Sequence, residues 1–296
     1  MELALETDFE ARHPLRRAEI ALHTGRLVRI ASAGLMARSF EDAFSTHEDL
    51  PPRRLGQDLI AAAATGALEL HDWIIAGPRE LSAVLYRGVP LESVAASFLG
   101  TRNDPQLGHV VPGHVPDRER RILPAYSSTG AFLTHAAGLG WAMRLAKSTE
   151  ITLCFADATR ASEADVHTGL NFAGVFEARA VFLVTSSAEA THSFARRAVA
   201  YGLASSRVDG SDVSAIAEVT SEAVARARTG GGATIIDVVL TADPMERLKS
   251  ALGPMELEAI RSRAVSDVEH ALAKARTDGP PPRSAVAAQV TRASRT

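Results

Sequence analysis

The stretch ITLCFADATRASEADVHTGLNFAGVF, residues 151–176, decides the expected fold. An apolar run typical of a buried strand ends at a single acid, Asp157, and a helical pattern follows with Ser162 as its candidate N-cap. In open α/β sheets, ligands bind just outside the carboxyl ends of the strands. Asp157 is therefore the first candidate site residue, and the alanines on both sides of it require an explanation.

Strand and helix patterns alternate on the C-terminal side of this stretch. Further strand-like runs are AVFLVT, SRVDG and ATIIDVVL, and helical patterns separate them. This order predicts an α/β protein, a three-layer α/β/α fold with a mainly parallel central sheet. Before residue 151 the pattern is mainly helical, so the sheet is expected to carry a helical N-terminal front.

The N-terminal half is expected to contain several helices and one long loop. Helical spacing covers residues 27–44, 55–68, 91–100 and 128–146, whereas residues 101–125 hold too many prolines and glycines for a regular element. WIIAGPREL is expected to be a turn that carries Arg79. We divide the chain into an N-terminal extension (1–25), one α/β domain (26–278) and a C-terminal tail (279–296).

The composition is that of an ordinary globular protein. Of 296 residues, 46% are hydrophobic and 23% are charged, with a net charge of −3, so the basic excess that favours nucleic acid or anionic membranes is missing. The N-terminus lacks a signal-peptide pattern, and no uncharged apolar run reaches about 18 residues. We expect a cytoplasmic protein with neither nucleic acid nor membrane as a partner. The single cysteine, Cys154, is expected to pack in the core.

A polar pair ends the strand that follows Asp157. Ser186 and Ser187 come directly after the apolar run AVFLVT. Because the carboxyl ends of neighbouring parallel strands share one edge, Asp157 and Ser187 are candidate ligands of a Mg²⁺ ion that would hold a diphosphate. The alternative is that Asp157 only caps the next helix, and the residue types alone favour this alternative.

Several blocks, in one order and at consistent spacing, resemble the α subunit of the E1 component of 2-oxo acid dehydrogenase complexes. The blocks are GQDLIAAAATGALELHDW, PRELSAVLYRGVPLESVAASFLG, PGHV, STGAFLTHAAGLGWAMRLA, FADATRASEADVHTGLNFAGVF, RVDGSDVSAIAEVTSEAVARARTG and PPPRSAVAAQV. The resemblance implies the thiamine diphosphate-binding fold, with thiamine diphosphate and Mg²⁺ as cofactors. It also implies decarboxylation of a 2-oxo acid and acyl transfer to a lipoyl group. The implied partners are an E1 β subunit, in an α2β2 heterotetramer, and the E2 lipoyl acyltransferase.

The resemblance also assigns roles to individual residues. It implies that His114 is catalytic and that Asp157 and Ser187 bind the metal. The residues that it places at the cofactor are Arg79, Ser128, Gly130, Asp157, Ala158 and Ser187.

The cofactor motif departs from the family pattern at several positions. Gly-Asp-Gly appears as Ala156-Asp157-Ala158, Asn-Asn as Ser186-Ser187, and Tyr-Arg as Pro78-Arg79, and the family's long loop after the last strand is absent between Leu240 and Pro244. An added Cβ where glycine allows close approach costs about 1–3 kcal/mol if the backbone is strained. Two hypotheses remain: an E1 α-type enzyme subunit with impaired cofactor binding, and a non-catalytic E1-α-like partner with an assembly or regulatory role.

Overall fold

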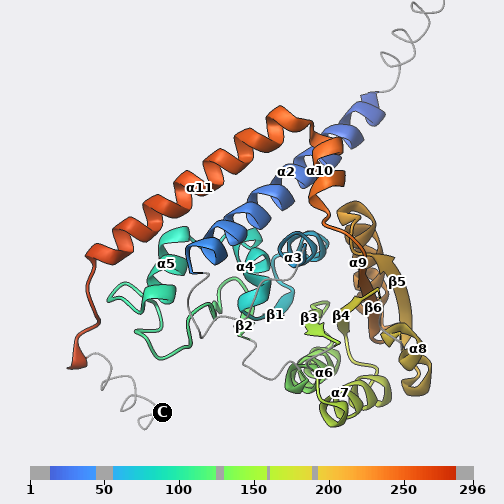
Figure 1. Ribbon diagram of the computed structural model, residues 1–296. Helices are drawn as coiled ribbons and strands as arrows, with labels where there is room; N and C mark the ends of the chain where they lie inside the picture. The colour runs from blue at the N-terminus through green and yellow to red at the C-terminus, as the bar shows by residue number, and fades with distance from the viewer. Residues whose placement is uncertain (1–13, 45–55, 125–129, 159–160, 189–192, 285–296) are drawn as a thin grey trace, which may run out of the picture.

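The computed structural model describes residues 14–44, 56–124, 130–158, 161–188 and 193–284, with side chains from residue 23 onward. These ranges form a central sheet with helices on both faces, and two long helices lie side by side outside one of the helical layers (Figure 1). The architecture confirms the predicted three-layer α/β/α fold with a helical N-terminal front.

All six described strands are parallel. In sequence order they are β1 (Trp73–Ala76), β2 (Ile122–Pro124), β3 (Thr152–Asp157), β4 (Ala180–Ser187), β5 (Ala204–Asp209) and β6 (Thr234–Leu240). Their order across the sheet is β2-β1-β3-β4-β6-β5. Asp157 pairs in register with Thr185, so Ser187 lies two residues farther along the neighbouring strand. The carboxyl ends of β3 and β4 therefore meet at one edge, as the sequence predicts.

The helices cover both faces of the sheet, and some of them pack outside one of these two layers. They are α2 (Pro14–Ala43), α3 (Gln57–Thr65), α4 (Leu81–Tyr86), α5 (Leu91–Leu99), α6 (Ala131–Leu145), α7 (Glu163–Val175), α8 (Phe194–Ala198), α9 (Val213–Arg228), α10 (Met245–Leu252) and α11 (Pro254–Thr277), with 3₁₀ turns η1 (Pro78–Glu80) and η2 (Val199–Tyr201). α3, α4 and α9 lie over one face of the sheet, and α6, α7 and α8 cover the other. α11 packs along α2 and α5 outside the first layer (Figure 1).

Alternating side chains of β3 divide the apolar interior into two cores. Leu153 and Phe155 belong to the core under α3 and α9, whereas Cys154 and Ala156 belong to the core under α6 and α7. Burial is the main cause that raises the pKa of the Cys154 thiol, and the charge of Glu80 raises this pKa by a smaller amount. The thiol is therefore kept protonated, and the predicted packing role of Cys154 is confirmed.

Close approach between α6 and α7 requires glycine at their contact. A Cβ on Gly169 would lie 2.5 Å from the Leu133 Cβ, and one on Gly130 would lie 2.5 Å from the Asp165 Cβ. These separations are below any normal carbon–carbon contact, so the two helices could not pack this closely with larger residues. The glycine- and alanine-rich α6 therefore packs closely against α7.

The structure differs from the sequence-based expectation at the N-terminal side of the sheet. The segment expected to be a turn contains β1, and the proline-rich loop ends in β2. The helix expected from residue 27 begins at Pro14, and α4 was not predicted. None of the helices within the described ranges is both long and apolar enough to cross a membrane.

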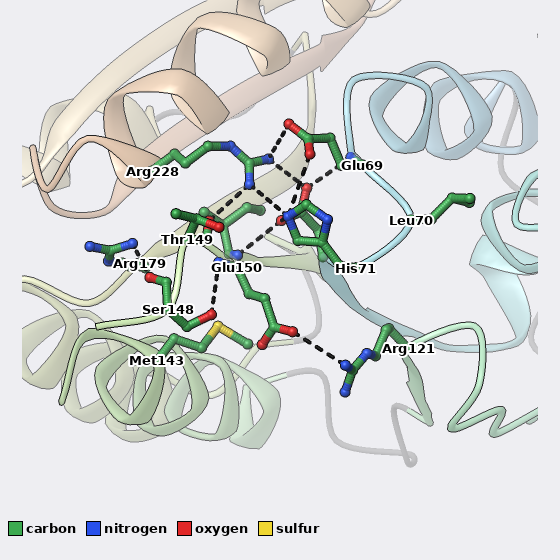
Figure 2. A network of polar contacts seen from close by, with 12 residues as sticks. Glu69, Leu70, His71, Arg121, Met143, Ser148, Thr149, Glu150, Arg179 and Arg228 are labelled. Atoms are coloured by element: carbon green, nitrogen blue, oxygen red, sulfur yellow. Dashed lines mark hydrogen bonds and ion pairs between the residues drawn. The ribbon is translucent and has the colours of Figure 1, made fainter. Parts of the chain in front are cut away.

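A buried carboxylate, Asp72, joins the amino ends of β1 and β3. Asp72 is fully buried and accepts hydrogen bonds from the Glu69 N–H (2.8 Å), the Ile151 N–H (3.0 Å) and the Arg228 guanidinium (2.8 Å). Arg228, in the last turn of α9, also donates to the Thr149 carbonyl at 2.8 Å (Figure 2). The network fixes the strands at the edge opposite to the candidate site.

Candidate functional site

Asp157 ends β3 in a buried position and is bound to an arginine. Its carboxylate is 2% exposed, and one oxygen accepts a hydrogen bond from Arg79 Nη1 at 2.7 Å. The N-cap of α7 is Ser162, whose hydroxyl accepts from the Asp165 N–H at 3.1 Å. The carboxylate of Asp157 is therefore not the cap of that helix, and the interpretation favoured by residue types alone is wrong.

Arg79 reaches Asp157 from the short turn η1, which follows β1. Pro78 begins the turn with a φ that suits helical geometry, and Glu80 ends it. The Glu80 carboxylate is buried and accepts from the Gly77 N–H at 3.0 Å and from Gln57 Nε2 of α3 at 2.7 Å. Both oxygens of Glu80 are thus bound, and the turn that carries Arg79 is tied to α3.

The buried position of Glu80 affects its ionisation. Burial raises the pKa of the Glu80 carboxyl, and the Gly77 N–H, the Arg79 charge and the Gln57 amide oppose this shift in decreasing order. The Asp157 charge adds to the increase. Glu80, Arg79 and Asp157 therefore form one electrostatic cluster at the carboxyl ends of β1 and β3.

The two serines that end β4 point to opposite faces of the sheet. Ser187 shares the face of Thr185 and Asp157, because side chains two residues apart lie on one face. Ser186 lies on the other face and donates its hydroxyl to Asp237 Oδ1 at 2.6 Å. Ser193, which precedes α8, donates to Asp237 Oδ2 at 2.6 Å. Asp237 is fully buried, so these serines satisfy a buried carboxylate of β6.

His114 and Ala158, two further predicted site residues, do not take part in the contact between Arg79 and Asp157. His114 is 6% exposed; its Nδ1 lies 3.2 Å from the Val111 carbonyl, and its own carbonyl accepts from the Ser97 hydroxyl at 3.4 Å. Ala158 donates its N–H to the Thr185 carbonyl at 3.0 Å, which continues the β3–β4 pairing by one residue. The catalytic role of His114 and the cofactor contact of Ala158 stay predictions.

Two further predicted cofactor residues lie at the start of α6. Gly130 is buried at the beginning of the helix, where the close contact with Asp165 explains the need for glycine. Ser128 lies outside the described residues. The structure therefore brings together Arg79, Asp157 and the end of β4, and it gives Gly130 a packing role.

Few side chains that could coordinate a metal ion lie around Asp157 in the described part of the chain. Within the described ranges, no group of three or more His, Cys, Asp or Glu side chains could hold a metal ion. The space beneath the ends of β3 and β4 is lined mainly by apolar side chains together with Gln57, Glu80 and Thr185, and it has no room for a water molecule. Ligand pockets for cofactor-sized molecules usually measure about 300–1,000 Å³.

The connection after β6 is short and is held by Asp209, at the end of β5. β6 ends at Leu240 and α10 begins at Met245, as the sequence predicts. Asp209 accepts hydrogen bonds from the Thr241 hydroxyl, from Ser211 and from Arg247. The Thr241 hydroxyl, and next the Ser211 N–H, lower the pKa of the Asp209 carboxyl.

This pKa shift predicts an acid-dependent contribution of Asp209 to stability. A carboxyl with a lowered pKa in the folded state stabilises the fold above the unfolded value of about 3.9, and this contribution disappears as the pH falls through the lower folded value. We expect the difference in free energy of unfolding between the wild type and Asp209→Asn to shrink as the pH falls from about 6 to about 3. Urea unfolding at several pH values measures it. A difference that stays constant or grows on acidification would contradict the assignment.

Sequence reasoning missed three residues that shape this site: Gln57, Glu80 and Asp237. Asp237 interrupts the apolar run ATIIDVVL, as Asp157 ends ITLCFAD, so a single acid inside a buried strand was an available signal. Glu80 follows Arg79 directly, but nothing in the sequence indicates that it is buried.

Comparison with known proteins finds relatives of this chain among dehydrogenase subunits. The profile of the dehydrogenase E1 component family matches residues 52–241. The 3-methyl-2-oxobutanoate dehydrogenase subunit alpha of Mycobacterium tuberculosis (strain CDC 1551 / Oshkosh) is 33% identical over 212 residues, which is 66% of this chain and 55% of that protein. The mitochondrial 2-oxoisovalerate dehydrogenase subunit alpha of Mus musculus is 31% identical over 182 residues, or 58% of this chain and 41% of that protein.

Other similarities extend the comparison. The pyruvate dehydrogenase E1 component subunit alpha of Bacillus cereus is 30% identical over 194 residues, or 62% of this chain and 50% of that protein. A crystal structure of transketolase from Campylobacter jejuni subsp. jejuni NCTC 11168 aligns with a TM-score of 0.49 and 13% identity, covering 88% of this chain and 48% of that one. The chain spans about half the length of the curated relatives that it matches.

Proposed function

This chain belongs to the dehydrogenase E1 component family, and from that premise we propose that it is an α-type subunit of a 2-oxo acid dehydrogenase E1 component. One observation carries the proposal. The matched segment, residues 52–241, contains all six described strands together with Arg79 and Asp157. The similarity thus covers the sheet and the site at its carboxyl edge.

The reaction and the partners follow from the relatives and are proposals for this chain. The names of the similar proteins contain 3-methyl-2-oxobutanoate, 2-oxoisovalerate and pyruvate. These names support a 2-oxo acid as the substrate class. We propose an E1 β subunit as the direct partner, in an α2β2 assembly that transfers an acyl group to the lipoyl group of an E2 acyltransferase in the cytoplasm.

We infer that the residues of this chain do not fit Mg²⁺-bound thiamine diphosphate, the cofactor that the family resemblance implies. The Asp157 carboxylate is bound to Arg79, and the Ser186 hydroxyl is bound to Asp237 on the other face of the sheet. Mg²⁺ requires near-octahedral oxygen donors, and a diphosphate requires space beside them. Beside this engaged carboxylate, the described end of β4 supplies the hydroxyls of Thr185 and Ser187 on the same face, and the space beneath these strand ends has no room for a water molecule. Impaired cofactor binding by the chain alone is therefore part of the proposal.

Coexpression with an E1 β-type chain from the same organism tests the proposed subunit role. We expect the two chains to elute together in size-exclusion chromatography, with a mass from light scattering that exceeds the sum of one copy of each. The α-type fold would provide the shared surface, whether or not cofactor is bound. Separate elution of the two chains at micromolar concentration would overturn the assignment.

The second hypothesis, a non-catalytic partner, has its own support. At the carboxyl edge of the sheet, the family resemblance implies contacts with cofactor and substrate. This edge instead holds the Arg79–Asp157 ion pair and the short connection between β6 and α10. Calorimetric titration of the α/β complex with thiamine diphosphate and Mg²⁺ separates the hypotheses. Micromolar binding that Asp157→Asn abolishes would indicate an enzyme subunit, and millimolar or undetectable binding would indicate a non-catalytic partner.

A further inference from the structure

Arg79 and Asp157 form an ion pair that is almost completely enclosed. The side chain of Arg79 is 11% exposed and that of Asp157 is 2% exposed, and Nη1 and Oδ2 are 2.7 Å apart. Arg79 follows β1 and Asp157 ends β3, which are hydrogen-bonded neighbours in the sheet. The pair therefore bridges two adjacent strand ends in a medium where water screens charge poorly.

Two buried side chains hold the turn that carries Arg79. Gln57 donates to Glu80 at 2.7 Å from the first residue of α3, and Glu80 accepts the Gly77 N–H at 3.0 Å. Gln57 is 5% exposed and Glu80 is 9% exposed. Because both oxygens of Glu80 are bound, the turn has little freedom to swing Arg79 away from Asp157.

A divalent cation would compete with Arg79 for the same carboxylate. Metal coordination uses the oxygen lone pairs that accept the guanidinium N–H, and an arginine beside a bound dication would be repelled by it. The metal could bind only by displacing Arg79 from an enclosed position, which would leave the guanidinium partly buried without its carboxylate. Losing a close contact with an opposite charge in an enclosed position is unfavourable.

We propose that Arg79 takes the place of the metal ion at the carboxyl ends of β1 and β3, and that Glu80 with Gln57 positions Arg79 there. The inference rests on the proposed E1 α-type assignment and deepens it, because it names the feature of this chain that excludes the cation. The strand-end site is thus held closed by an ion pair formed from the chain's own residues.

Mn²⁺ binding to the full-length chain tests the proposal. Free Mn²⁺ is measured by electron paramagnetic resonance for the wild type, Arg79→Gln, Asp157→Asn and the control Arg247→Gln, whose arginine pairs with the partly exposed acids Asp209 and Asp212. We expect the wild type and the control to bind only weakly, and Arg79→Gln to bind Mn²⁺ about tenfold more tightly or better. The double variant Arg79→Gln/Asp157→Asn should lose this gain.

Two results would overturn the proposal. One is tighter Mn²⁺ binding by the wild type than by Arg79→Gln, because the arginine would then assist the cation. The other is equal binding by both proteins, because Arg79 would then not be what excludes the metal.

A second variant covers the case in which Arg79→Gln does not fold. Gln57→Met keeps the arginine but frees one oxygen of Glu80, so we expect a smaller gain in Mn²⁺ affinity at unchanged far-ultraviolet circular dichroism. A merely structural role for Gln57 would leave the Mn²⁺ affinity unchanged. Coelution of the wild type with the β-type chain is measured separately, so a failure of this inference is distinguishable from a failure of the proposed function.

Discussion

Replacing Asp72 with alanine is expected to lower the free energy of unfolding by about 3–5 kcal/mol. Asp72 is fully buried, and its carboxylate accepts hydrogen bonds from Glu69, Ile151 and Arg228. Alanine removes all three interactions and leaves the Arg228 charge without its buried acceptor. The loss should be large because the network joins the amino ends of β1 and β3 to the end of α9.

Urea unfolding followed by circular dichroism measures this effect. The matched control is Glu163→Ala, which removes an acid that pairs with Arg197 at 2.7 Å but is 79% exposed. An exposed pair contributes less than about 1 kcal/mol, so the control should be nearly neutral. A similar small loss for Asp72→Ala would contradict the description of the network as buried and tightly bound.

Arg79→Met is the second substitution with a large expected effect, again about 3–5 kcal/mol of unfolding free energy at neutral pH. Methionine retains an unbranched apolar side chain in place of the arginine stem but leaves the Asp157 carboxylate buried without the guanidinium. The pair is only 11% and 2% exposed, so water cannot compensate for the lost partner.

Arg247→Met is the control for this substitution. Arg247 contacts Asp209 at 3.1 Å and Asp212 at 2.9 Å, but its side chain is 55% exposed. We expect it to cost less than about 1 kcal/mol. Equal losses for Arg79→Met and Arg247→Met in thermal or urea unfolding would show that the enclosure of the Arg79 pair has no energetic consequence.

The elements with strong local patterns could be predicted from the sequence. β3, β4 and β6 are largely apolar runs, and Ser162 caps α7 as its residue type indicates. β1 was missed because WIIA leads directly into Gly77 and Pro78, which are typical turn residues. β2 was missed because it is three residues long, ends in a proline and lies in a loop rich in structure breakers.

The candidate site was only partly predictable, for a different physical reason. The position of Asp157 at a strand end follows from local pattern, but its contact with Arg79 joins residues 78 positions apart. Such a contact depends on which strands become neighbours in the sheet. The sequence also does not distinguish a buried acid such as Asp72 from an exposed one, because burial depends on how the whole chain packs.

The direct test of the account is a double-mutant cycle between Arg79→Met and Asp157→Asn, measured as free energies of unfolding in urea. If the two side chains form the buried ion pair that closes the strand-end site, the double variant should be more stable than Arg79→Met alone, with a coupling energy of about 1.5 kcal/mol or more. Losses that add within about 0.5 kcal/mol would show that Arg79 and Asp157 do not interact and would contradict the account.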